Sequence, residues 1–185
     1  MRINEIENPR PYITKHIEPL DNAKKRMREL SIVEAYPHLM KWIYTGLFSA
    51  NPQTMDAYAN VFYAIRSVLP DQVIATYSNL PTVYRGLMLK NESQLDKISN
   101  GGLDIKSQIS AWTPRKQLAI DYARSDDAGV VLKHNPVESE VVLALNGPTI
   151  KYLGINSMLV ANPNETILSL PILKITPEMV EKVIR

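Results

Sequence analysis

The chain has 185 residues, of which 45% are hydrophobic and 22% are charged, and its formal net charge at pH 7 is +2. This length and composition are typical of one globular domain, or of a small domain with an attached subdomain. Because the chain contains no cysteine, a disulfide framework, a cysteine nucleophile and a thiolate metal site are excluded. The small net charge does not by itself indicate nucleic-acid binding.

Histidine placement and hydropathy narrow the class of protein further. The three histidines, His16, His38 and His134, lie far apart in the sequence and lack the spacing of a metal site, so we expect no bound metal. No apolar run reaches the roughly 18 residues that span a bilayer, and residues 1–12 lack the apolar core of a secretory signal. We therefore expect a cytoplasmic protein with no membrane partner.

The first third of the chain has the pattern of helices. Asp21 is predicted to cap a helix that runs to about Ala35, and Pro37 is predicted to lie in the first turn of a second helix. A third helix is predicted from Pro52, because apolar residues then recur at spacings of three and four. Residues 1–80 are accordingly predicted to form a helical N-terminal subdomain.

After Pro81 the pattern is mainly that of β-strands. Apolar, β-branched and aromatic runs predict strands over residues 82–89, 107–113, 129–134, 139–147, 165–171 and 172–176. Two helices are predicted in this part, one with Thr113 as its N-cap and a closing one over residues 176–185 with Thr176 as its cap. Helices followed by strands indicate an α+β fold, with a core domain over residues 81–185.

A fixed cation lies within the first of these strands. Arg85 stands in the run TVYRGLML between the apolar residues Val83 and Leu87, and its guanidinium is always charged. Its burial would require an anionic partner, and Gly86 would allow the backbone to approach a ligand closely. One interpretation is a clamp for a phosphate or diphosphate. The other is an arginine that reaches solvent from an edge strand or pairs with a carboxylate.

The segment ISAWTPRKQLAIDYA, residues 109–123, places two hydroxyl groups where a strand turns into a helix. They belong to Ser110 and Thr113. Because a helix N-terminus offers free backbone N–H groups and a partial positive charge, a nucleotide could bind there. Thr113 is also expected to cap the helix, and the two interpretations are compatible.

The order of the segments YRG, ISAWT and LAIDYA resembles the mono-ADP-ribosyltransferases of the arginine–serine–glutamate class. The small enzymes that T-even phages use on host proteins are of this kind. The resemblance covers roughly residues 82–175 and implies an ADP-ribosyltransferase-like two-sheet β core behind a variable helical portion. It implies an enzyme that transfers ADP-ribose from NAD+ to a host macromolecule, expected to be a protein, and releases nicotinamide.

The resemblance also implies which residues contact NAD+. Arg85 would hold the diphosphate, and Gly86 would let the strand approach the dinucleotide. Tyr84 and Trp112 would offer aromatic surface to the nicotinamide or its ribose, although either ring could simply belong to the core.

The serine of the family pattern is not matched directly. The Ser-Thr-Ser position of the family falls on Ala111, Trp112 and Thr113, so the first serine is absent unless Ser110 replaces it through a shift of one residue. In the family this serine supports the catalytic glutamate and the nicotinamide ribose. The role is therefore assigned to Ser110 or Thr113, and the choice between them stays open.

Two segments compete for the catalytic glutamate. Glu138 and Glu140 form a literal Glu-x-Glu at the head of a strand, but they follow Thr113 closely, and a strand must fit between. Glu165 leaves room for a hairpin and heads the penultimate strand, as the family's glutamate does, although Pro163 stands where the upstream glutamate would be. Glu165 is the preferred catalytic residue.

The departures from the pattern leave other functions open. Because the family's upstream glutamate accompanies arginine acceptors, Pro163 leaves the acceptor undefined: a side chain of a host protein such as RNA polymerase or the translation machinery, or an RNA. A plain NAD+ glycohydrolase is also permitted. Ala111 and Pro163 favour a further alternative, a catalytically degenerate phage protein that docks on a host enzyme.

A last hypothesis rests on the basic run NAKKRMREL, residues 22–30, which contains Lys24, Lys25, Arg26 and Arg28. It could mark a nucleic-acid-binding domain, whose binding would depend steeply on salt. A charge run of this kind is more often the solvated face of a helix, and we favour that interpretation.

Overall fold

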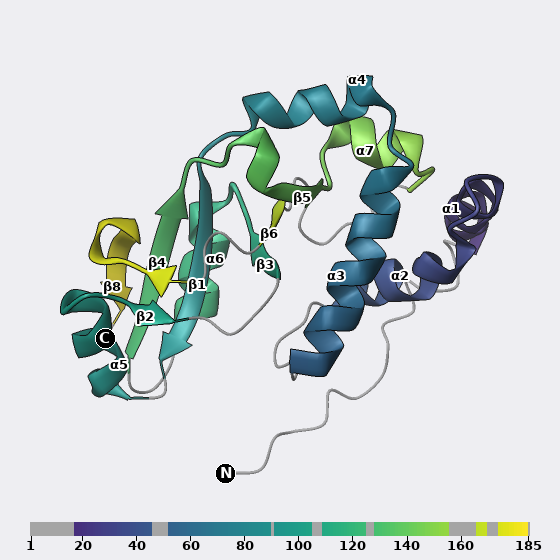
Figure 1. The fold of residues 1–185 in the computed structure, drawn as a ribbon. Helices are drawn as coiled ribbons and strands as arrows, with labels where there is room; N and C mark the ends of the chain where they lie inside the picture. Colours follow the sequence, from purple (N-terminus) through teal and green to yellow (C-terminus); the bar gives the residue numbers. More distant parts are fainter. Residues whose placement is uncertain are drawn as a thin grey trace, which may run out of the picture.

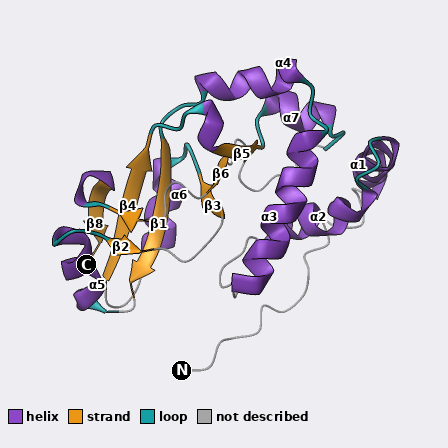
Figure 2. Ribbon diagram, in the orientation of Figure 1, coloured by secondary structure: helices purple, strands orange, loops and turns teal. Residues whose placement is uncertain are grey.

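A computed structural model of the chain describes residues 17–45, 52–89, 91–104, 109–124, 128–155, 166–169 and 174–184. Over these residues helices dominate the first part of the chain and strands the later part (Figure 1). Figure 2 shows the strands gathered on one side of the molecule and the long helices on the other. The fold is mixed, as the predicted α+β class requires.

The N-terminal helices follow the predicted pattern with two corrections, both in the first helix. They are α1 (Ile17–Glu29), α2 (Tyr36–Thr45) and α3 (Pro52–Ser67). The prediction that Asp21 caps the first helix is wrong, because α1 already begins at Ile17. The helix also ends at Glu29 rather than at the predicted Ala35. It ends there because Ser31 takes a left-handed φ of 59° and the Ile32 N–H donates to the Met27 carbonyl at 2.9 Å. Pro37 and Pro52 lie in the first turns of α2 and α3, as predicted.

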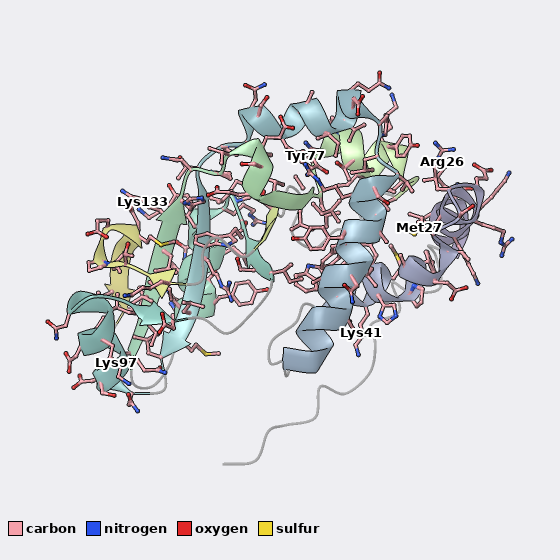
Figure 3. The ribbon with its side chains drawn as sticks, viewed as in Figure 1. Arg26, Met27, Lys41, Tyr77, Lys97 and Lys133 are labelled. Atoms are coloured by element: carbon pink, nitrogen blue, oxygen red, sulfur yellow. The ribbon has the colours of Figure 1, made fainter. Side chains whose placement is uncertain are left out.

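Short helices link these three to the strands. The helix α4 (Asp71–Ile74) and the 3-10 turn η2 (Ala75–Asn79) follow α3 and precede the first strand. Tyr77, labelled in Figure 3, is fully buried and its hydroxyl lies 3.1 Å from the Thr149 hydroxyl. One continuous cluster of buried apolar side chains runs from these helices into the strands. The division of the chain at residue 80 stays a prediction.

The described strands form three small antiparallel sheets. The β1 sheet has the order β1 (Val83–Leu89), β4 (Ala128–His134), β8 (Val180–Ile184). The β3 sheet has the order β3 (Ile109–Trp112), β6 (Thr166–Ser169), β5 (Val141–Ala144). A third pair joins β2 (Leu103–Asp104) to β7 (Lys174–Ile175). Each predicted strand therefore overlaps an observed one, most of which are shorter, whereas β2 and β8 were not predicted.

The predicted closing helix is wrong. Residues Pro177–Met179 form only a 3-10 turn, η5, and the chain then continues as β8. Val180 and Val183 in this segment are β-branched, and both pair with residues of β4, so tertiary pairing prevails over the helical start signal at Thr176.

The other helices of the β part differ from prediction in detail. The helix after Thr113 is α6 (Lys116–Ala123), and its N-cap position is Arg115 rather than Thr113, so the predicted cap is wrong. Two helices were not predicted, α5 (Glu92–Ser99) and α7 (Gly147–Tyr152). The second has Asn146 as its N-cap, whose side chain accepts a hydrogen bond from the Thr149 N–H at 3.1 Å.

Helix α6 packs unusually closely on the β1 sheet. A Cβ atom on Gly86 would lie 1.9 Å from the Ala119 carbonyl oxygen, and one on Gly129 would lie 1.7 Å from the Ala123 carbonyl oxygen. Both glycines are therefore required by the backbone of α6. This contact fixes which face of β1 meets the helix, and hence which side chains of β1 point away from it.

Candidate functional site

Arg85 lies on the face of β1 that points away from α6. Successive residues of a strand alternate between its faces, and the side chain position of Gly86 is occupied by α6. Arg85 therefore shares the opposite face with Val83, and its partners there on β4 are Leu132 and His134. Val83 and Leu132 are fully buried in the main core, so the guanidinium is set among apolar side chains.

The guanidinium of Arg85 is not neutralised by any described group. Its Nη1 atom is buried and has no hydrogen-bond partner among the described residues, although the residue as a whole is half-buried. Burial lowers the pKa of Arg85 to about 10, so the group is still a cation at neutral pH. A buried guanidinium nitrogen without a partner is unfavourable for folding, and such an exception suggests a functional role.

A second polar group lies beside Arg85 on this face. His134 is the diagonal neighbour of Arg85 across the β1–β4 pair, a position whose side chains are typically about 7–8 Å apart. Its Nε2 atom lies 2.8 Å from the Glu140 carboxylate, and the Trp112 ring centroid lies 5.9 Å from that of His134. Glu140 belongs to the 3-10 turn η3 (Glu138–Glu140), and its carboxylate also accepts the Val137 N–H at 3.1 Å.

The strand β3, which carries Ser110 and is followed by Thr113, lies next to β1. Tyr84 and Thr113 exchange backbone hydrogen bonds of 2.7 and 2.8 Å, which joins the β1 and β3 sheets. The Ser110 hydroxyl accepts the Trp112 indole N–H at 2.8 Å, and the Thr113 hydroxyl accepts the Arg115 N–H at 3.1 Å. Trp112, Thr113 and Ser110 are only 1%, 4% and 7% exposed, so these groups stabilise the strand-to-helix turn.

Tyr84 lies on the other face of β1 from Arg85. Its ring packs with Ala119, Ala123 and Val131 against α6, and the Lys116 Nζ lies 5.7 Å from the ring centroid. The structure therefore does not bring the Tyr84 ring together with the Arg85 guanidinium. Gly86 also faces α6, whose backbone fills the space that a side chain at this position would need.

Glu181 pairs the lysines on this α6 side of the sheet. It hydrogen-bonds Lys116 and lies 2.9 Å from Lys133, which Figure 3 labels. These hydrogen bonds, from Lys116 first and then Lys133, lower the pKa of Glu181 to about 2. Lys116 and Lys133 are thus both paired with a carboxylate, unlike Arg85.

The preferred catalytic residue, Glu165, lies outside the described residues, as does Pro163. The next residue, Thr166, begins β6, pairs with Trp112 and is 1% exposed. Its hydroxyl is buried without a hydrogen-bond partner among the described residues. Of the competing pair, Glu138 is exposed and Glu140 is the carboxylate bound to His134.

The pair that His134 forms with Glu140 was not identified from the sequence. His134 was considered only as a metal ligand, yet the alternation of the run GVVLKH already placed it on one face with Val130 and Leu132. The contact between His134 and Glu140 could not be predicted, because it depends on the turn that follows β4.

The described residues offer neither a metal site nor a membrane-spanning helix. Among the described residues no group of three or more histidine, aspartate or glutamate side chains is placed to hold a metal ion. No helix in the described ranges is long and apolar enough to cross a membrane. Comparison with protein-family models, with curated proteins and with solved structures gave no match.

Proposed function

We propose that the protein is an NAD+-dependent mono-ADP-ribosyltransferase with an ADP-ribosyltransferase-like core. The observation that carries the proposal is the buried Nη1 of Arg85, which has no partner among the described residues. The planar fork of a guanidinium fits a diphosphate, and a bound diphosphate would neutralise a cation that the apolar surroundings leave uncompensated.

The connection of the two sheets supports the same proposal. The Tyr84–Thr113 bridge brings the strand of Arg85 beside the strand of Ser110, in the order that the resemblance implies. Because backbone groups of a strand point to alternate edges, Gly86 directs its N–H and C=O toward the same edge as Tyr84. A carboxamide such as that of nicotinamide has the complementary acceptor and donor.

In the proposed mechanism Arg85 anchors the diphosphate so that the bond between nicotinamide and ribose is fixed in the site. This bond breaks through a transition state with positive charge on the ribose, which a carboxylate stabilises. Glu165 is proposed for that role, supported by Ser110 or Thr113. One preorganised electrostatic contact of this kind is worth about 3–4 kcal/mol. The acceptor is proposed to be a protein of a bacterial host.

Labelled NAD+ tests the proposal directly. The protein is incubated with NAD+ labelled in the adenylate and with a bacterial lysate, and label on protein and on RNA is measured together with free nicotinamide. We expect labelled protein with the wild type, and a loss of about 100-fold or more with Glu165→Gln. Arg124→Ala, which removes an exposed arginine paired with Asp121, is the control. Labelled RNA would change the acceptor, whereas wild-type protein that releases no nicotinamide would contradict the proposal.

Three of the residues predicted to contact NAD+ are occupied by contacts within the chain. This favours a second candidate function, a binding protein that keeps the fold without the enzymatic activity. The Ser110 and Thr113 hydroxyls are engaged by the chain itself, and the Trp112 ring is almost fully buried. A binding protein would neither bind NAD+ nor release nicotinamide, but it would co-purify with a stoichiometric host enzyme. A glycohydrolase would release nicotinamide without labelling any macromolecule.

A further inference from the structure

We propose that His134, oriented by Glu140, is the general base that accepts the proton of the acceptor nucleophile. This inference rests on the proposed function and names a catalytic residue for it. Histidine is the side chain most often used for proton transfer near neutral pH, and His134 is the histidine that lies beside Arg85 on the same face of the β1 sheet.

The surroundings of His134 hold the imidazole in one orientation. Glu140 fixes Nε2 at 2.8 Å, and the Trp112 ring packs against the imidazole with its centroid 5.9 Å away. Trp112 is itself held by its indole hydrogen bond to Ser110 at 2.8 Å. Catalytic histidines are commonly oriented in this way, by a hydrogen bond to a carboxylate and by a side chain packed against the ring.

The second ring nitrogen is available for proton transfer. Among the described residues Nδ1 of His134 has no hydrogen-bond partner, whereas Nε2 is bound to Glu140. The side chains of His134 and Glu140 are 23% and 20% exposed, so the pair lies at the rim of the site where an acceptor can reach it. The nearby charged groups are Glu140 from η3, which is bonded to Nε2, and Arg85, the diagonal neighbour on β1, while the non-titrating Trp112 of β3 packs against the ring.

Transfer of ADP-ribose to the acceptor releases one proton, which His134 is proposed to accept. The acceptor oxygen or nitrogen forms a bond to C1′ of the nicotinamide ribose while the bond from C1′ to the nicotinamide nitrogen breaks. The electron pair of the broken bond passes to the nicotinamide ring and neutralises its positive charge. The proton of the acceptor passes to Nδ1 of His134 and then to solvent, and no further reactant is needed. Arg85 holds the dinucleotide throughout and does not exchange a proton.

Substitution with chemical rescue tests this assignment. His134→Ala is compared with wild type for NAD+ binding, nicotinamide release and labelling of protein, each with and without added imidazole. We expect turnover to fall about 10²–10⁴-fold, NAD+ affinity to change less than about threefold, and imidazole to restore part of the lost turnover. His134→Gln keeps a hydrogen-bonding side chain beside Glu140 and should fold even if His134→Ala does not, yet it should be inactive and should not be rescued. His38→Ala, at an exposed histidine of α2, is the matched control.

The outcomes separate this inference from the proposed function. If the wild type releases nicotinamide and His134→Gln does so at the wild-type rate, the base assignment is overturned while the transferase proposal stands. If His134→Ala loses NAD+ affinity in step with turnover and imidazole restores neither, His134 is a structural residue and the inference is wrong. If the wild type itself does not turn over NAD+, both proposals are overturned together.

Discussion

The two faces of β1 differ in whether their cationic side chains have an anionic partner. On the face that meets α6, Lys116 and Lys133 both pair with Glu181. On the other face Arg85 has a buried nitrogen with no partner in the described part of the chain. The first arrangement is sufficient to explain a stable fold, whereas the second is not, because an unpaired buried cation destabilises the folded state. This difference is the reason to place a ligand on the Arg85 face.

The largest expected effect on the free energy of unfolding comes from disrupting the contact between α6 and the β1 sheet. Gly129→Ala introduces a Cβ only 1.7 Å from the Ala123 carbonyl oxygen, so α6 must move off the sheet. We expect a loss of about 3 kcal/mol or more in the free energy of unfolding, measured by urea denaturation. Gly147→Ala, where a Cβ meets nothing within 4 Å, should change stability little. Equal stability of the two variants would show that α6 does not pack as described.

The next largest effect is a gain in the free energy of unfolding, and it comes from the face of β1 that carries Arg85. Arg85→Met replaces an uncompensated buried cation with an apolar side chain of similar length, so we expect the unliganded protein to gain about 1–3 kcal/mol of stability. Arg66→Met is the matched control, because Arg66 donates to the Val141 carbonyl and lies over the Tyr77 ring, and it should destabilise. Thermal unfolding of both variants measures this, and a destabilised Arg85→Met would mean that Arg85 has a structural partner.

A smaller loss of stability is expected from a substitution at Ser110, before the turn that leads from β3 into α6. Ser110→Ala leaves the buried Trp112 indole N–H without its acceptor, at a penalty of about 1–3 kcal/mol. Ser78→Ala, which removes an exposed hydroxyl bonded within its own turn, should cost less than about 0.5 kcal/mol. The free energies of unfolding of the two variants provide the test. If Ser110→Ala had no effect, the hydroxyl would be free for the ribose after all.

The smallest effect concerns the paired charges of the α6 face. The folded-state pKa of Glu181 is lowered to about 2 from 4.5, so the unfolded state binds more protons between these values. Stability from this group is therefore present above about pH 4.5 and is lost as the pH falls toward 2. Denaturation of wild type and Glu181→Gln across this range should converge at low pH. A difference between them that is constant with pH would contradict the pairing.

The sequence predicts the strands of this fold better than its helix boundaries and contacts. Apolar alternation in the run TVYRGLML places Arg85 and Gly86 on opposite faces, and the structure shows the face of Gly86 filled by α6. The Thr-Pro signal at Thr176 predicted a helix, but it precedes a strand because β4 offers an edge for pairing. Local signals do not report on such an edge.

The candidate site was predictable only in part. Arg85 and the strand of Ser110 were identified, and the bridge from Tyr84 to Thr113 brings their strands together. The side chain of Tyr84 faces away from Arg85, which strict alternation would have indicated. The pair of His134 and Glu140 arises from a turn, and no local pattern reports such a contact.

Calorimetric titration of NAD+ into wild type, Arg85→Met and Arg124→Met tests the central claim most directly. We predict binding by wild type and Arg124→Met, and a loss of about 10–100-fold in affinity for Arg85→Met, since a hydrogen bond to a charged group contributes about 1.5–3 kcal/mol. The Arg85→Met protein should remain folded and be at least as stable as wild type. Equal NAD+ affinity of all three proteins, or no binding by any of them, would contradict the account.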